Sequence, residues 1–168
     1  AQRLVTHIGK RLNRPIRREA LESPLPGGKK RMTKRELRPE LSENYGDDYY
    51  SEPINRFMQD YGALASRIVA MAADHPARLQ PICEDTQLTE AEVVYFVREE
   101  MAQKPADVLL RRTNVGWSGG CSLRLIERCV ELIGQELAWD DEKKLSEVRD
   151  AVGAFENLKK RQHLASHF

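Results

Sequence analysis

Apolar residues recur at helical spacing through most of the chain after residue 51, and no stretch alternates apolar and polar residues as a half-buried strand would. Gly62, and later the pair His75 and Pro76, are expected to break the helices that they interrupt. The fold class is therefore all-α, a compact bundle of about five to six helices. The predicted helices cover residues 51–61, 64–75, 89–101, 105–112, 122–137 and 140–158.

The first part of the chain has a different pattern. Leu4, Val5, Ile8 and Leu12 fit one face of a helix that begins at or before Ala1. Residues 15–32 are rich in Pro, Gly and basic residues, which disfavour a helix and favour an extended connection. We therefore expect an extended basic N-terminal segment ahead of the bundle.

The most detailed helix signal lies between Thr89 and Met101. Thr89 can cap the helix and Glu92, three residues later, can bond back to it, which is a capping box. At about 100° per residue, one continuous apolar arc should face the core and a polar arc should face solvent. The apolar arc holds Val93, Val94, Phe96, Val97 and Met101, and the polar arc holds Glu92, Tyr95, Arg98 and Glu99.

Two charged residues fall on the apolar side of this region. Glu100 lies inside the apolar arc, and Arg112 projects between apolar residues of a second short helix that starts near Pro105. A buried carboxylate needs a donor, so we predict a structural ion pair between Glu100 and Arg112, or failing that Arg111. The alternative is that both side chains reach solvent.

The last two predicted helices form a pair. The first runs from Ser122 to Leu137, and Asp140 caps the second. We expect the second to bury one apolar face, made of Leu145, Val148, Val152, Phe155 and Leu158.

Short motifs in the second half carry a family resemblance. Glu90-Ala91-Glu92, Tyr95, Val97, Glu100, Asp107, Leu109 and Arg111-Arg112-Thr113 resemble the signature of the C-terminal helical cap domain of FAD-dependent, quinone-linked glycerol-3-phosphate dehydrogenases. Pro24 to Gly28, Tyr61-Gly62, and Glu136 to Trp139 agree in order and spacing, the last resembling a Leu-Gly-Trp entry to the final helix. The resemblance runs from about Leu4 to Lys160.

The resemblance implies a function for the longer protein rather than for these residues. It implies that residues 1–32 are the end of an upstream catalytic region plus a basic linker, and that residues 33–168 are a C-terminal α-helical domain. The full-length enzyme would oxidise sn-glycerol 3-phosphate to dihydroxyacetone phosphate and pass electrons through FAD to quinone. It also implies a cytoplasmic protein whose partner is its own N-terminal FAD-binding domain, with a homodimer and a peripheral contact on the inner face of the cytoplasmic membrane as further expectations.

Charge is unevenly distributed, although the net charge is close to zero. Residues 1–38 hold twelve Lys and Arg against three Asp and Glu, and the remainder holds fifteen against twenty-three. The basic part leaves a helical nucleic-acid-binding module open as an alternative, and a protein-interaction module is another. The basic residues have no interleaved aromatics, so no nucleic acid is expected as a partner.

The chain lacks the common motifs of catalysis and cofactor binding. No GxGxxG follows a predicted strand, the four His show no ligand spacing, and Gly27-Gly28 and Gly119-Gly120 lack the context of a phosphate loop. Cys83, Cys121 and Cys129 have no metal spacing and are expected to be free thiols packed in or near the core. We therefore assign no catalytic, cofactor-binding or metal-ligating residue, and expect no FAD in this part of the enzyme.

Overall fold

A computed structural model of the chain describes residues 7, 9–13, 52–118 and 121–165. Within these residues every regular element is a helix, and the only sheet-like pairing is one isolated bridge between Pro81 and Thr89. The all-α prediction is therefore confirmed. Of the helix expected around Leu4 to Leu12, residues 7 and 9–11 are described and are helical, and Leu12 is 66% exposed. The other residues of that helix and most of the basic segment lie outside the described residues.

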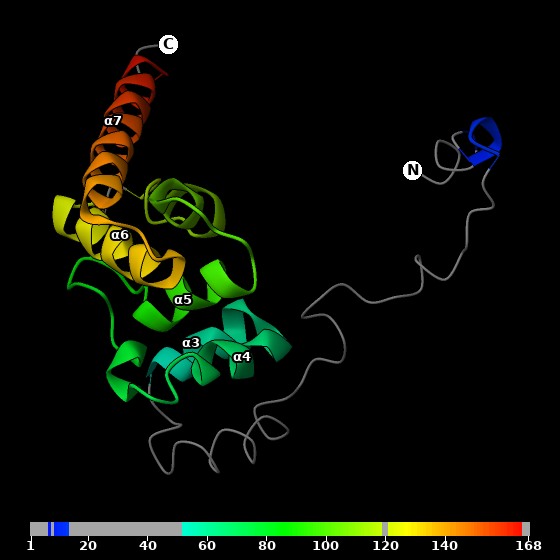
Figure 1. Cartoon of the computed structure of the whole chain (residues 1–168), viewed down its shortest axis with the longest axis horizontal. Coiled ribbons are helices and arrows are strands. Elements are labelled where there is room, and N and C mark those ends of the chain that lie inside the picture. The colour runs from blue at the N-terminus through cyan, green and yellow to red at the C-terminus, as the bar shows by residue number, and fades with distance from the viewer. Residues whose placement is uncertain (1–6, 8, 14–51, 119–120, 166–168) are drawn as a thin grey trace.

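A pair of helices forms one side of the bundle (Figure 1). Helix α3 spans Glu52–Asp60, the short 3-10 turn η3 spans Gly62–Leu64, and α4 spans Ala65–Ala70. Gly62 has a φ of 56°, a left-handed conformation that suits glycine and turns the chain between the two helices. Phe57 and Ile68 are fully buried and join the two helices to the core. After α4 the chain reaches a second 3-10 turn, η4, at Pro76–Leu79.

Helix α5 (Glu90–Arg98) lies at the centre of the bundle, packed against α4 on one side and α6 on the other (Figure 1). The predicted capping box is present, with the Glu92 amide donating to Thr89 Oγ1 and the Thr89 amide donating to the Glu92 carboxylate. The predicted polar arc is wrong in part, because Glu92 is 1% exposed and Tyr95 is 3% exposed. Neighbours on both sides bury nearly the whole circumference of the helix, so a one-sided pattern could not describe it.

The chain reverses direction after α5 and returns as a π-helix, η5 (Asp107–Arg112). Met101 occupies the reversal with a φ of 55°, and the next amide, of Ala102, donates to the carbonyl of Phe96 at 2.8 Å. This bond joins residues six positions apart and ties the reversal back to the last turn of α5. Gly116 then packs so closely that an added Cβ would come within 2.5 Å of the Leu110 and Phe155 side chains.

Helices α6 (Leu123–Leu137) and α7 (Asp141–Ala165) complete the bundle. The Leu125 amide donates to Ser122 Oγ, which caps α6, and the Lys143 amide donates to Asp140 Oδ1, the predicted cap of α7. Ala138, with a φ of 54°, ends α6. Figure 1 shows the C-terminal end of α7 standing clear of the other helices.

The buried face of α7 agrees in part with the predicted one, because Val148 and Val152 pack against the core but Leu145 does not. Leu145 is 59% exposed, whereas Glu147 is 1% and Ala151 3% exposed. Phe155 is buried as expected, and with Glu147 and Ala151 it forms a face at i, i+4 and i+8 that is rotated away from Leu145. Leu145 lies two positions before Glu147, about 200° around the helix from this face, and therefore points to solvent.

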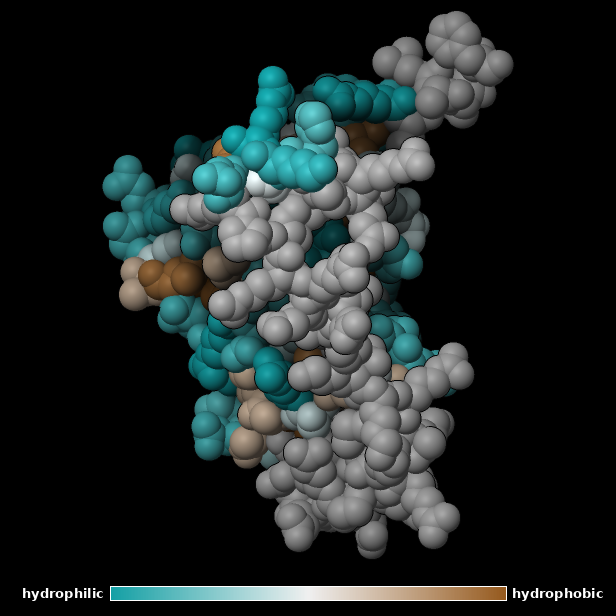
Figure 2. Space-filling model, turned by 90° about the vertical axis from the view of Figure 1, so that its right-hand side faces the viewer, coloured by the Kyte–Doolittle hydropathy of each residue, from teal (hydrophilic) through white to brown (hydrophobic). Residues whose placement is uncertain are grey.

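The described surface is mostly polar on the face that Figure 2 shows. Figure 2 shows hydrophilic side chains over most of the described residues on one face, with a few apolar side chains between them. No helix of the described part has both the length and the apolar character needed to cross a membrane.

Candidate functional site

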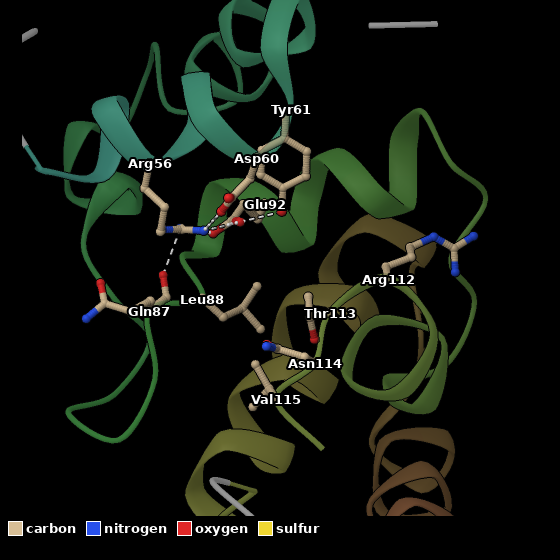
Figure 3. Close-up of a pocket in the computed structure, with 10 residues that line it drawn as sticks. All are labelled: Arg56, Asp60, Tyr61, Gln87, Leu88, Glu92, Arg112, Thr113, Asn114 and Val115. Atoms are coloured by element: carbon tan, nitrogen blue, oxygen red, sulfur yellow. Dashed lines mark hydrogen bonds and ion pairs between the residues drawn. The ribbon is translucent and has the colours of Figure 1, made fainter. Parts of the chain in front are cut away.

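A pocket of about 380 Å³ lies where α3, the loop before α5, α5 itself and the segment after η5 meet (Figure 3). Its wall combines two acidic and two basic side chains with two amides, two hydroxyls and two aliphatic side chains. The lining residues are Arg56, Asp60, Tyr61, Gln87, Leu88, Glu92, Arg112, Thr113, Asn114 and Val115. Two of the short motifs that carry the family resemblance, at 90–92 and 111–113, therefore contribute to one pocket.

Glu92 is the most heavily bonded side chain of this pocket. Its Oε1 accepts from Arg56 Nη1 at 2.9 Å and from the Tyr61 hydroxyl at 2.6 Å. Its Oε2 accepts from Arg56 Nη2 at 2.5 Å, and from the amide and the hydroxyl of Thr89 at 2.8 and 2.9 Å. Five donors thus saturate a carboxylate that is 1% exposed, which is the condition for tolerating such a charge in a core.

Arg56 brings the balancing charge from α3. Burial alone would lower the pKa of Arg56, but the hydrogen bonds and negative charge of Glu92 outweigh burial and raise the pKa. Arg56 Nη2 also donates to the Gln87 carbonyl at 2.8 Å, so the guanidinium ties α3 both to α5 and to the loop before it. The fork of Arg and the carboxylate make a two-point contact that fixes the angle between the two helices.

Tyr61 completes the network as a donor. Burial, followed by the charge and the hydrogen bond of Glu92, raises the pKa of the Tyr61 phenol well above its ordinary value. The phenol therefore stays protonated at neutral pH and cannot act as a base. With the Glu92 carboxylate saturated and both Nη atoms of Arg56 bonded, the three groups hold the fold together rather than offering an acid, a base or a nucleophile.

The predicted ion-pair residues meet at the edge of this region. Arg112 Nε donates to Glu100 Oε2 at 3.1 Å, and Arg112 Nη1 and Nη2 donate to the carbonyls of Asp107 and Glu100. The side chains of Arg112 and Glu100 are 22% and 36% exposed, so they meet at the surface of the bundle and not inside it, as the helical arc had suggested. Arg111 pairs instead with Asp107 at 2.8 Å on its own helix.

Further ion pairs join α5 to α6, and the sequence pattern did not indicate them. Arg98 donates twice to Glu136, at 2.6 and 2.8 Å, and Arg128 donates twice to Glu90, at 2.9 and 2.6 Å. The partners are 38 residues apart in each pair. Local spacing carries no signal for such pairs, and neither does it for Arg56 and Glu92, 36 residues apart.

Among the side chains that the structure describes, the thiols and the remaining titratable groups form no recognisable reactive centre. Within the described ranges, no group of three or more His, Cys, Asp and Glu is placed to hold a metal ion. Cys83, Cys121 and Cys129 are free, and burial raises the pKa of Cys121 to about 11 and that of Cys129 further, which keeps both thiols protonated.

Comparison with known families gives one clear match. The sequence model of the family described as the C-terminal domain of alpha-glycerophosphate oxidase matches residues 19–144, which is most of this chain. Comparison with curated proteins and with solved structures found no match.

Proposed function

Because the chain belongs to the family of C-terminal domains of alpha-glycerophosphate oxidase, we propose that it is the helical domain of an enzyme that oxidises sn-glycerol 3-phosphate to dihydroxyacetone phosphate. The chain is the C-terminal domain of a flavin-dependent oxidoreductase. In this proposal FAD takes the hydride, and the domain covers the catalytic part without contributing a reacting group.

The chemistry of the described residues supports a structural role. A flavin pyrophosphate is held by a glycine-rich turn between a strand and a helix, and the described residues contain no strand. In the pocket on α3 and α5, Glu92 and Arg56 are already bonded to each other and to their neighbours, which supports a structural role for this pocket. FAD and substrate would therefore be bound by the part of the polypeptide that precedes this domain.

Membrane quinone is the electron acceptor that we propose, with molecular oxygen as the second candidate. The resemblance to quinone-linked dehydrogenases favours quinone, and the word oxidase in the description of the matching family favours oxygen. The two acceptors leave different products, a quinol or hydrogen peroxide, so the products distinguish them.

The proposal is tested on the purified full-length polypeptide with bound flavin. Addition of sn-glycerol 3-phosphate under anaerobic conditions should bleach the flavin absorbance, and a soluble quinone analogue should restore it. Glycerol and glycerol 2-phosphate are the controls for the phosphate and for its position. A flavin that stays oxidised with sn-glycerol 3-phosphate would refute the proposed substrate, and rapid peroxide formation in air without quinone turnover would select oxygen.

The structural role of the domain has its own test. The 168-residue chain alone should elute from gel filtration without flavin absorbance after incubation with FAD, and it should not oxidise glycerol 3-phosphate. Retention of stoichiometric FAD by this chain would show that the domain itself forms part of the flavin site.

A further inference from the structure

Helices α5 and α6 pack side by side and run in the same direction (Figure 1). Arg128 bonds Glu90 toward the start of the two helices, and Arg98 bonds Glu136 at their ends. The partners are 38 residues apart in each pair, so the register between the helices is the same along their length. The two segments that enter these helices therefore arrive at the same end of the pair.

Each of the two entering segments carries a cysteine. Cys83 precedes Glu90 by seven positions, and Cys121 precedes Arg128 by seven positions. The two cysteines thus follow the same 38-residue offset as the ion pairs. Both side chains are partly buried and pack against the same hydrophobic core.

Local contacts keep both cysteines close to their helix ends. The Ile82 amide donates to the Leu88 carbonyl at 2.8 Å, so Cys83 belongs to a tight loop that folds back onto the start of α5. Cys121 is directly before Ser122, whose hydroxyl caps α6. Neither cysteine is therefore carried away from its helix by a long connection.

The electrostatics of the thiols agree with this placement. Burial is the main cause that raises the pKa of Cys121, the charge of Lys159 lowers that pKa, and a negative charge on Cys83 raises it. Charges act on one another in this way only over a short distance, so Cys83 and Cys121 are neighbours. For Cys129 burial is again the main cause of a raised pKa, and both other thiols raise it further.

Cys129 is the less suitable partner for either of the other thiols. It is fully buried, so an oxidant in solvent does not reach it. It also lies eight positions after Cys121, which in a helix is about 12 Å, whereas a disulfide joins Cα atoms about 4.4–6.8 Å apart. Exposure and position together select Cys83 and Cys121.

We propose that Cys83 and Cys121 are a redox pair that hydrogen peroxide converts into a disulfide, which fastens the loop before α5 to the start of α6. Peroxide first oxidises the Cys83 sulfur to a sulfenic acid and leaves as one water. The Cys121 sulfur then attacks that sulfur, the S–S bond forms, and the sulfenic oxygen leaves as a second water. Two thiols thus lose two protons and two electrons, and one peroxide is reduced to two waters.

The order of these steps follows from the state of the thiols. The pKa of Cys121 is raised to about 11, so its thiol is the resolving partner and not the first to be oxidised. Such a thiol reacts slowly, so the pair responds to sustained peroxide rather than to a brief pulse. This inference goes beyond the proposed function, although an enzyme that passes electrons to oxygen would itself release the oxidant.

The disulfide would act on the loop that supports the Arg56 network. That loop supplies the Gln87 carbonyl, which accepts from Arg56 Nη2 at 2.8 Å, and it supplies Leu88 to the wall of the pocket. A covalent bond to the start of α6 restricts the opening of this loop. Oxidation would therefore hold α3, the loop and α6 in their present arrangement.

Peptide mapping of the full-length enzyme tests the pairing, because trypsin places each cysteine on its own peptide. Cleavage after Arg78, Arg98, Arg112, Arg124, Arg128 and Lys143 gives peptides 79–98, 113–124 and 129–143. The enzyme is treated with hydrogen peroxide, remaining thiols are alkylated, and the digest is analysed by mass spectrometry without reductant. We expect peptide 79–98 linked to peptide 113–124, loss of the link with dithiothreitol, and an alkylated peptide 129–143.

Two controls show that the fold selects this pair. The same treatment in guanidinium chloride should give links among all three peptides, whereas the native enzyme should give one. Cys129→Ala should retain the link, and Cys121→Ala should abolish it and leave Cys83 unlinked. The same mixture in native and unfolded enzyme, a link through Cys129, links only between separate molecules, or oxidised cysteines without a link would overturn the proposal.

Hydrogen exchange then tests the effect on the loop. The amide of Ile82 should exchange about tenfold more slowly in the oxidised enzyme than in the reduced one, because the disulfide opposes local opening. Cys121→Ala is the control and should show no change on oxidation. Equal exchange of the Ile82 amide before and after linkage would refute the fastening of the loop. Linkage needs only added peroxide, so it is measured separately from oxidation of sn-glycerol 3-phosphate.

Discussion

Replacing Glu92 with glutamine should destabilise the domain strongly, although the two side chains have nearly the same shape. The carboxylate accepts five hydrogen bonds. A glutamine amide can accept at one atom only, and its NH₂ group would face donors from Arg56 or Thr89. The substitution would also leave the Arg56 guanidinium, 22% exposed, without its counter-charge.

The size of the effect follows from these contacts. Breaking a buried ion pair costs about 3–5 kcal/mol, and the partial exposure of Arg56 favours the lower end. We expect about 3 kcal/mol for Glu92→Gln, which corresponds to a fall in Tm of about 10 °C for a domain of this size. Urea unfolding of the 168-residue chain followed by circular dichroism measures the change.

Glu136→Gln is the matched control. Glu136 also accepts two hydrogen bonds from one arginine, but that arginine, Arg98, is 49% exposed. Solvent competes for the charge there, so the cost should stay below about 1 kcal/mol. Equal losses for the two substitutions, or a double-mutant cycle of Arg56→Met with Glu92→Gln that gives no coupling, would refute the reasoning.

Three further predictions concern other parts of the domain. Gly116→Ala should lower the free energy of unfolding by about 2 kcal/mol, because the new Cβ would come within 2.5 Å of two side chains. Gly153→Ala is the control, since open space surrounds Gly153 and alanine should stabilise α7 slightly. Thermal unfolding of both variants tests this. Burial raises the pKa of Cys121 to about 11, above its ordinary value of 9.0, so the stability that the thiol contributes is present below pH 9 and lost as pH rises from 9 to 11. Cys121→Ser should flatten that loss in urea titrations at several pH values. Arg112→Ala should cost about 1 kcal/mol, because its partner Glu100 keeps contact with solvent, and a loss as large as that of Glu92→Gln would contradict this.

Local signals in the sequence predicted the elements well. The capping box of Thr89 and Glu92, the cap at Asp140 and the break at Gly62 depend on residues within a few positions of each other, and all three are present. Each rests on backbone groups that must be satisfied wherever the helix lies. The resemblance carried by the motifs around α5 and η5 agrees with the family that matches residues 19–144.

The features that the sequence did not predict depend on contacts between helices that are far apart in the chain. Helical spacing placed Glu92 and Tyr95 on an outer face, but α5 has neighbours on both sides and has almost no outer face. Arg56, the partner of Glu92, lies on a helix 36 residues earlier, beyond any local pattern. The π-helical winding of η5 also had no signal, since its length and spacing suit an ordinary helix equally well.

The double use of Glu92 has a consequence for how the domain opens. One carboxylate closes the first turn of α5 and also holds α3 through Arg56, so the helix end cannot fray without separating the two helices. Helix ends usually exchange their amide hydrogens by local opening, long before the rest of the protein unfolds. Here the amide of Thr89 should exchange as slowly as amides in the middle of α6, through cooperative unfolding of the whole bundle. The start of α5 would thus behave as part of the most persistent unit of the domain rather than as its edge.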